Sequence, residues 1–183
     1  MKKVKGDQIS NIQLPDLDGS RFNLDSIKGK RYLLAFFRFP GCPFCNLRVH
    51  DLVRQYNSFG SNFTIVGIFD STLKNLQRYA TRHDATFPIL ADEANIYYQE
   101  YGITRSLLGT LKGAIFRFPT VLYAMFVKGY IPTSFGGNIM TMPADFLVNE
   151  EGVIEVAHYG RDEGDHIPIE IVKQFSHSTI ENA

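Results

Sequence analysis

The hydrophobic residues of the chain fall into short continuous runs that alternate with segments of helical spacing. Such short runs are typical of strands that are covered on both faces of a sheet. The segments predicted as strands are residues 33–37, 63–69, 87–90, 144–148 and 153–157. The segments predicted as helices are residues 43–59, 71–83, 93–101 and 167–175, with Ser71 and Asp92 as expected N-caps of the second and third. This alternation predicts an α/β fold with a central sheet flanked by helices.

Two regions depart from the alternation. Residues 12–14 and 21–24 are expected to pair as an N-terminal hairpin across a polar turn. Residues 104–141 carry several apolar groups without the strand–helix rhythm, and Pro119 and Gly129 suit the start and the end of a helix there. We interpret the chain as one domain with an insertion at about 104–141. The insertion either enlarges the core, which is the favoured interpretation, or forms helices that cover a sheet edge or make a homodimer contact.

The length, charge and apolar segments of the chain limit the functions that it can have. A chain of 183 residues is expected to form one domain with a substantial core. Its 19 Lys and Arg residues balance 19 Asp and Glu residues, which argues against a nucleic acid or an anionic lipid as partner. No apolar stretch is long enough to span a membrane, and no apolar segment of a secretory signal follows the basic N-terminus. We therefore expect a cytoplasmic protein with no membrane partner.

The two cysteines of the chain lie in the sequence Cys42-Pro43-Phe44-Cys45, directly after a predicted buried strand. Pro43 suits the first position of a helix, so Cys42 is expected at a helix N-terminus, where the macrodipole stabilises a thiolate. Cys45 follows one turn later, within reach of a disulfide, and is expected to be the more buried of the two. Zinc would require further ligands, and no second Cys-x-x-Cys pair exists. The motif therefore predicts a redox-active dithiol, with no metal or cofactor.

The neighbours of the cysteines are weaker candidates. Arg38 precedes the turn and could support a thiolate, although an arginine at the end of a strand is more often solvated or ion-paired. Phe39 and Phe44 flank the cysteines and could form an apolar rim for substrate, although packing in the core is an equal alternative.

Most of the chain resembles the thioredoxin fold, and specifically the alkyl hydroperoxide reductase and thiol-specific antioxidant family of peroxiredoxin-like proteins. The resemblance is carried by the Cys-x-x-Cys turn, the strand that ends in Phe-Phe-Arg, and three further segments. These segments are residues 14–19, 87–92 and 142–152. The resemblance implies a central sheet of four or five strands, with the cysteines at the carboxyl end of a central strand. It also implies a cis peptide at Met142–Pro143, beside the cysteines, where related proteins dock a substrate backbone.

Departures from the family pattern bear on the mechanism. Typical peroxiredoxins resemble a Pro-x-x-x-Thr-x-x-Cys pattern; with Cys45 as its cysteine, Cys42 occupies the Thr position and Arg38 the Pro position. The arginine that these enzymes use near a later strand is replaced by Pro143. Because these changes remove donors for a peroxide, the sequence favours a thiol–disulfide oxidoreductase, in which Cys42 attacks and Cys45 resolves. In this reaction Met142, Pro143, Pro43, Phe44 and Arg38 are the expected substrate-binding residues.

Two other functions remain open. The first is a thiol peroxidase that reduces hydrogen peroxide or organic hydroperoxides, with Cys45 as a possible attacking thiol. The second is a redox-inert interaction module that docks through residues 104–141. Either enzyme would act on a disulfide-containing protein or a small hydroperoxide and would require a thiol reductant of the thioredoxin or glutathione type.

Overall fold

The computed structural model describes residues 1–80, 83–131 and 137–178. Its centre is a five-stranded mixed sheet in the order β5-β4-β3-β6-β7. Strands β3, β4 and β5 are parallel, and β6 and β7 are added as an antiparallel hairpin beside β3. The sheet strands are β3 (Arg31–Phe37), β4 (Phe63–Phe69), β5 (Ile89–Ala91), β6 (Ala144–Val148) and β7 (Ile154–Tyr159). The fold is thus the predicted α/β arrangement of helices around a mixed sheet.

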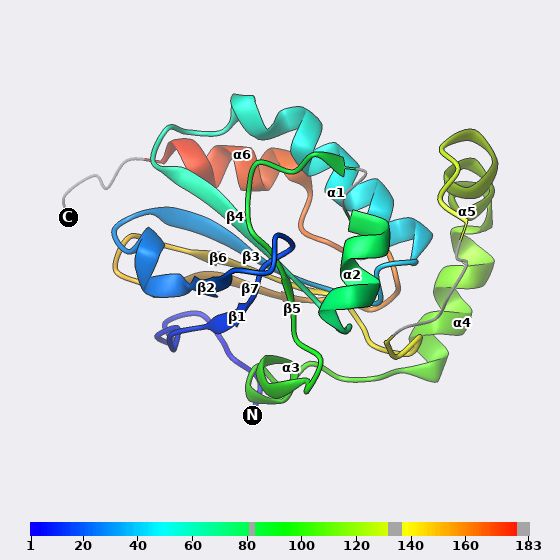
Figure 1. The fold of residues 1–183 in the computed structure, drawn as a ribbon, viewed down its shortest axis with the longest axis horizontal. Coiled ribbons are helices and arrows are strands. Elements are labelled where there is room, and N and C mark those ends of the chain that lie inside the picture. Colours follow the sequence, from blue (N-terminus) through cyan, green and yellow to red (C-terminus); the bar gives the residue numbers. More distant parts are fainter. Residues whose placement is uncertain (81–82, 132–136, 179–183) are drawn as a thin grey trace.

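Helices cover one face of the sheet, and a hairpin and a short helix cover the other (Figure 1). The first face packs against α1 (Pro43–Gln55), α2 (Leu73–Ala80) and α6 (Ile169–His177). The second packs against α3 (Ile96–Glu100) and the separate hairpin of β1 (Gln13–Pro15) and β2 (Arg21–Asn23). Alternate side chains of β3, such as Leu33 and Leu34, enter the two cores, which is why the whole strand is apolar.

Several element boundaries differ from the prediction because side chains close the turns. Thr72, not Ser71, caps α2: its hydroxyl accepts a hydrogen bond from the backbone N–H of Asn75 at 3.2 Å. Helix α2 is described as far as Ala80, and residues 81–82 of the predicted helix lie outside the described residues. Helix α3 begins later than expected, at Ile96, whose N–H donates to the Asp92 carboxylate at 2.9 Å. The Asp92 side chain therefore caps this helix, as predicted, but the helix begins at Ile96 and not at residue 93.

The sheet and the terminal helices show smaller shifts. Strand β5 begins at Ile89 rather than at residue 87. The residue before it, Pro88, accepts a hydrogen bond at its carbonyl from the N–H of Gly67. Helix α1 ends at Gln55, and a 3₁₀ turn at Tyr56–Ser58 takes up the remaining predicted helical residues. Helix α6 begins at Ile169, because the N–H of Ile167 instead donates to the buried Asp145 carboxylate at 2.8 Å.

Residues 104–131 form a helical segment at the side of the domain, here called the α4–α5 segment. It contains α4 (Leu107–Phe116), α5 (Phe118–Leu122) and a π turn at Tyr123–Val127, and Gly129 ends it with φ +71°. Figure 1 shows α4 and α5 stacked end to end beyond α1 and α2. The prediction that this region enlarges the core is wrong, because most of its large apolar side chains are exposed. Among the described residues, no helix has both the length and the apolar character to cross a bilayer.

Candidate active site

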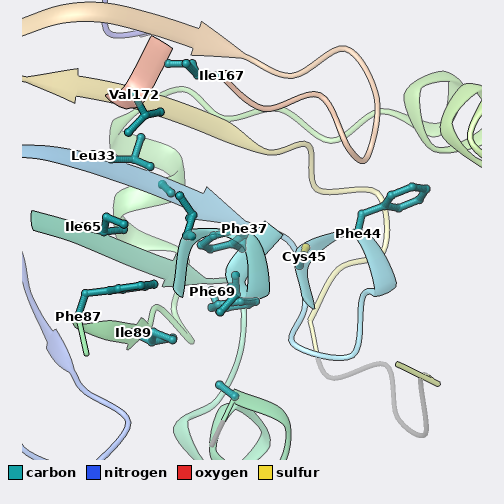
Figure 2. Close-up of a cluster of buried hydrophobic side chains, with 14 of the residues drawn as sticks. Leu33, Phe37, Phe44, Cys45, Ile65, Phe69, Phe87, Ile89, Ile167 and Val172 are labelled. Carbon is teal, nitrogen blue, oxygen red and sulfur yellow. The ribbon is translucent and has the colours of Figure 1, made fainter. Parts of the chain in front are cut away.

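The cysteine turn lies at the carboxyl end of β3, in the middle of the sheet. Cys42 is the N-cap residue of α1, and Pro43 occupies the first turn of the helix, as predicted. Figure 2 shows Cys45 beside Phe37 and Phe69 at this end of the sheet, whereas Phe44 points away from these side chains. The strand ends and the helix starts within a few residues, and this brings both thiols to one place.

Asn46 holds the turn from inside the helix. Its side-chain amide donates to the carbonyls of Pro40 and Cys42 at 2.7 and 2.8 Å, and its carbonyl oxygen lies 2.8 Å from the His83 ring. All of these contacts are buried, so the turn that presents Cys42 is fixed by hydrogen bonds rather than by chain stiffness alone. Nothing in the sequence pattern distinguished Asn46 from an ordinary helix residue.

The two thiols have opposite pKa shifts. Burial raises the pKa of the Cys42 thiol, but a hydrogen bond from the Cys45 thiol and the charge of Arg38 outweigh it, and the pKa falls to about 7. Burial also raises the pKa of Cys45, and the hydrogen bond that it donates to Cys42 raises it further. Both thiols are free and both are 0% exposed, so the prediction that Cys45 is the more buried is wrong. Cys42 is therefore the thiol that ionises first.

Arg38 joins the thiol to the rest of the site. Its Nη1 lies 3.5 Å from the Cys42 sulfur and 2.8 Å from the Glu163 carboxylate. Its Nε donates to the carbonyl of Thr141 at 2.9 Å, and its other terminal nitrogen contacts the carbonyl of Ile139. The side chain is buried, and its planar guanidinium presents five N–H donors in fixed directions. A lysine ammonium in its place would have three donors and could not match all of these partners. Arg38 is thus ion-paired, as the structural interpretation expected, and it also contacts the thiol.

Glu163 is a site residue that the sequence analysis missed. Burial raises the pKa of its carboxyl, although the ion pair with Arg38 acts in the opposite direction. Its side chain packs against Gly113 of α4, where an added Cβ would lie 2.9 Å from the Glu163 Cγ. Glu163 follows β7 in a loop that the pattern of strands and helices left unassigned, so only the fold brings it to Arg38.

An apolar cavity of about 370 Å³ lies between the cysteine turn and the α4–α5 segment. Arg38, Thr110 and Glu163 are the polar side chains of its lining. Its apolar lining comes from Phe39, Pro43, Phe44, Ala114, Phe118, Val121, Met125 and Ile139. Phe39 and Phe44 are also buried, so both proposed roles, packing and a rim for substrate, fit their positions.

Met142 and Pro143 lie beside the site but are covered. The Met142–Pro143 peptide is trans, since none of the peptide bonds in the described residues is cis, so the implied cis peptide is wrong for this structure. The N–H of Met142 donates to Thr104 and the carbonyl of Pro143 accepts from Gly160, and these bonds hold the segment with the ordinary trans bond. Both side chains are buried, with the Met142 sulfur packed against Gly109.

A second network supports the loop that receives Arg38. The Asp70 carboxylate, at the end of β4, accepts hydrogen bonds from the Thr141 hydroxyl at 2.7 Å and from the Asn95 amide at 3.0 Å. Thr141 is the residue whose carbonyl binds Arg38. In the described part of the chain, no group of three or more His, Cys, Asp or Glu side chains is arranged to hold a metal ion.

Comparison with known proteins agrees with this geometry. Residues 5–157 match the model of the AhpC/TSA family. The chain belongs to this family. It is 30% identical to a chloroplastic peroxiredoxin Q of Triticum aestivum over 115 residues, which are 61% of this chain and 52% of that protein. It is 27% identical to the peroxiredoxin Bcp of Escherichia coli over 117 residues, which are 61% of this chain and 74% of that protein. The chain thus spans about half the length of the wheat relative.

Solved structures confirm the thioredoxin-like fold. The peroxidoxin BcpB of Mycobacterium tuberculosis superposes with a TM-score of 0.65 at 16% identity, covering 88% of this chain and 89% of that one. A thiol:disulfide interchange protein DsbE from Chlorobium tepidum superposes with a TM-score of 0.60 at 16% identity, covering 96% of both chains. The family and the fold are therefore as the resemblance implied. The cytoplasmic location stays a prediction.

Proposed function

We propose that this AhpC/TSA-family protein is a thiol peroxidase in which Cys42 reduces a hydroperoxide and Cys45 resolves the product. The observation that carries the proposal is the contact of the buried Arg38 guanidinium with the Cys42 sulfur, together with a Cys42 pKa of about 7. A thiol with this pKa is substantially a thiolate at neutral pH, and the thiolate is the nucleophile.

The proposed reaction begins at Cys42. The Cys42 thiolate attacks one peroxide oxygen, an S–O bond forms, the O–O bond breaks, and the leaving oxygen takes a proton to become water or an alcohol. Cys42 is then a sulfenic acid. The Cys45 thiol attacks this sulfur, water leaves, and an intramolecular disulfide forms. An external dithiol of the thioredoxin type returns the disulfide to two thiols.

Arg38 supplies hydrogen-bond donors in place of those that the departures from the family pattern remove. The guanidinium is positioned by Thr141 and Ile139, and it faces both the thiolate and the cavity through which a peroxide would approach. It therefore serves as a fixed donor for charge that develops on the peroxide oxygens. The Arg38 contact therefore favours the peroxidase over the thiol–disulfide oxidoreductase that the sequence favoured.

Disulfide exchange remains the second candidate, because the Cys45 thiol hydrogen-bonds to the Cys42 sulfur, as a resolving thiol must. Burial argues against it: a protein disulfide would have to reach a sulfur that is 0% exposed. Met142 and Pro143, which would dock its backbone, are buried as well. A hydroperoxide has to reach the same buried sulfur, but it is far smaller than a protein disulfide and needs no backbone docking at Met142 and Pro143.

The test compares two substrates and two variants. We expect the wild-type chain to consume hydrogen peroxide or cumene hydroperoxide in the presence of a thioredoxin system, and to reduce insulin disulfides slowly. Cys42→Ser should abolish peroxide consumption. Cys45→Ser should keep a single turnover and accumulate a sulfenic acid. Peroxide consumption that survives in Cys42→Ser and is lost in Cys45→Ser would assign the attack to Cys45 instead. Turnover with neither substrate would favour the interaction module.

The pH profile gives a second test. Because the nucleophile is the thiolate, the single-turnover rate with peroxide should rise as pH increases through about 7 and level off above it. A rate that keeps rising through pH 9 would mean that Cys42 has the pKa of an ordinary thiol and that Arg38 does not activate it.

A further inference from the structure

The α4–α5 segment exposes large apolar side chains over both of its helices. Six of them are each 61–79% exposed: Leu107, Leu108, Ile115, Phe116, Phe126 and Val127. An apolar surface of this kind, on helices that lie at the edge of the domain (Figure 1), marks an interaction site. The site does not include either cysteine.

The charge of the same segment is one-sided. Residues 104–131 contain Arg105, Lys112, Arg117 and Lys128 and no Asp or Glu. Since the whole chain has 19 cationic and 19 acidic side chains, the rest of it holds 15 cationic against 19 acidic ones. The net charge of zero therefore conceals a basic, apolar segment on an acidic body.

Cationic and apolar side chains also meet in one groove. A groove of about 400 Å³ along α4 is lined by Leu108, Leu111, Ile115 and Phe116 together with Lys112 and Arg161. Two carboxylates of the adjoining loop are ion-paired, because Asp162 pairs with Arg117 at 2.7 Å and Glu163 pairs with Arg38. The first pair also neutralises Arg117, so Lys112 and Arg161 supply the positive charge of the groove. Lys112 and Arg161 are exposed. The groove thus combines exposed apolar groups with cations at their edge.

We propose that the α4–α5 segment docks this protein on the surface of an anionic lipid bilayer. Helices that lie in a membrane interface insert an apolar face containing Phe and Leu among the acyl chains and place Lys and Arg among the headgroups. Anionic headgroups attract each cation near the surface. A second copy of this chain is the less suitable occupant, because a symmetric contact would bring the cations of one copy against those of the other with no carboxylate from residues 104–131 to pair them.

The test measures binding to vesicles. The full chain is mixed with vesicles of phosphatidylcholine and phosphatidylserine, or of phosphatidylcholine alone, and bound protein is separated by sedimentation. We expect binding to the anionic vesicles, weaker binding at high salt, and little binding to the neutral vesicles. Cys42→Ser should bind like the wild type, which separates this proposal from the proposed peroxidase: either can fail while the other holds.

Variants assign the binding to the segment. Phe116→Gln with Phe126→Gln should weaken binding at least about tenfold, because each ring loses apolar burial. Lys112→Gln should weaken it about fivefold, the effect of one cation near an anionic surface. The matched controls are Ile96→Gln on α3, where Ile96 is 59% exposed, and Lys30→Gln, both outside the segment. Neither control should change binding.

Three outcomes would overturn the proposal. Equal binding to both vesicle types would remove the anionic lipid as the partner. Equal loss in the controls and the segment variants would remove the segment as the site. No vesicle binding, with a dimer in sedimentation velocity that Phe116→Gln dissociates, would assign the surface to a second copy of the chain.

Discussion

Strand β3 and the α4–α5 segment contain the same kinds of residues but place them in opposite environments. Leu33, Phe36 and Phe37 of β3 are 0% exposed, whereas Leu108 and Phe116 of α4 are 79% and 77% exposed. Strand β3 has a neighbour on each side and a core on each face. Helix α4 has the domain on one side and no described element of the chain over its large side chains. Apolar composition alone therefore does not separate a core element from a surface.

Helix α4 turns its small residues inward. Gly109 and Gly113 are buried, and they lie one helical turn apart against Met142 and Glu163. An ordinary surface helix faces the core with its large apolar side chains and the solvent with polar ones. Because α4 reverses this arrangement, its backbone approaches the active site closely while its leucines and Phe116 stay outside. The same two glycines thus bring the helix to Glu163 and leave the apolar surface available.

The largest expected effect is a difference in the free energy of unfolding between two variants, each of which replaces one phenylalanine, from β3 or from the α4–α5 segment. Phe36→Ala should lower the free energy of unfolding by about 3–5 kcal/mol, because it leaves a cavity between Tyr98, Tyr101 and Phe146. Phe126→Ala should change it by less than about 0.5 kcal/mol, because the ring is 76% exposed. Urea unfolding of both variants measures the difference. A cost above about 2 kcal/mol for Phe126→Ala would show that the segment packs against something in the folded chain.

A somewhat smaller effect is expected where the two regions meet. Gly109→Val should destabilise the protein by about 1–3 kcal/mol, because a Cβ there would lie 2.6 Å from the Met142 sulfur and 3.1 Å from the Arg161 carbonyl oxygen. Leu111→Val, which places a valine at an exposed position of the same helix, is the control for the effect of a β-branched side chain on the helix. Thermal unfolding compares the two. Equal changes in both variants would mean that α4 does not lie tightly on the domain.

The sequence predicted the parts of the molecule that follow from local pattern. The apolar runs located β3, β4 and β6, and Pro43 after Cys42 located the start of α1. What it could not supply comes from contacts between residues far apart in the chain. Glu163 reaches Arg38 across 125 residues, and the α4–α5 segment has an apolar pattern equally consistent with a core and with a surface. Which of these forms depends on the space left by the rest of the fold.

Arg38 gives the next effect. Arg38→Gln should raise the pKa of Cys42 above about 7, because it removes the positive charge beside the thiolate. At pH 7 the single-turnover rate with peroxide should then fall about fivefold for the first unit by which the pKa rises and about tenfold for each further unit. Ultraviolet absorbance of the thiolate gives the pKa directly. Arg31→Gln, at the other end of β3 and paired with Glu150, is the matched control and should leave the thiol unchanged.

The smallest expected effect comes from Glu163, and its sign is opposite. The carboxylate raises the pKa of Cys42, so Glu163→Gln should lower that pKa and increase the thiolate fraction below pH 7, where we expect the single-turnover rate to rise about two- to threefold. Measuring Arg38→Gln, Glu163→Gln and the double variant gives the coupling between the two charges. If the ion pair acts only through Arg38, the change at Glu163 should have little effect once Arg38 is replaced. A lower pKa of Cys42 in Glu163→Gln together with a slower single-turnover rate at every pH would contradict this account. That result would mean that the Glu163 carboxyl takes part in the reaction itself and does not act only through the charge beside the thiol.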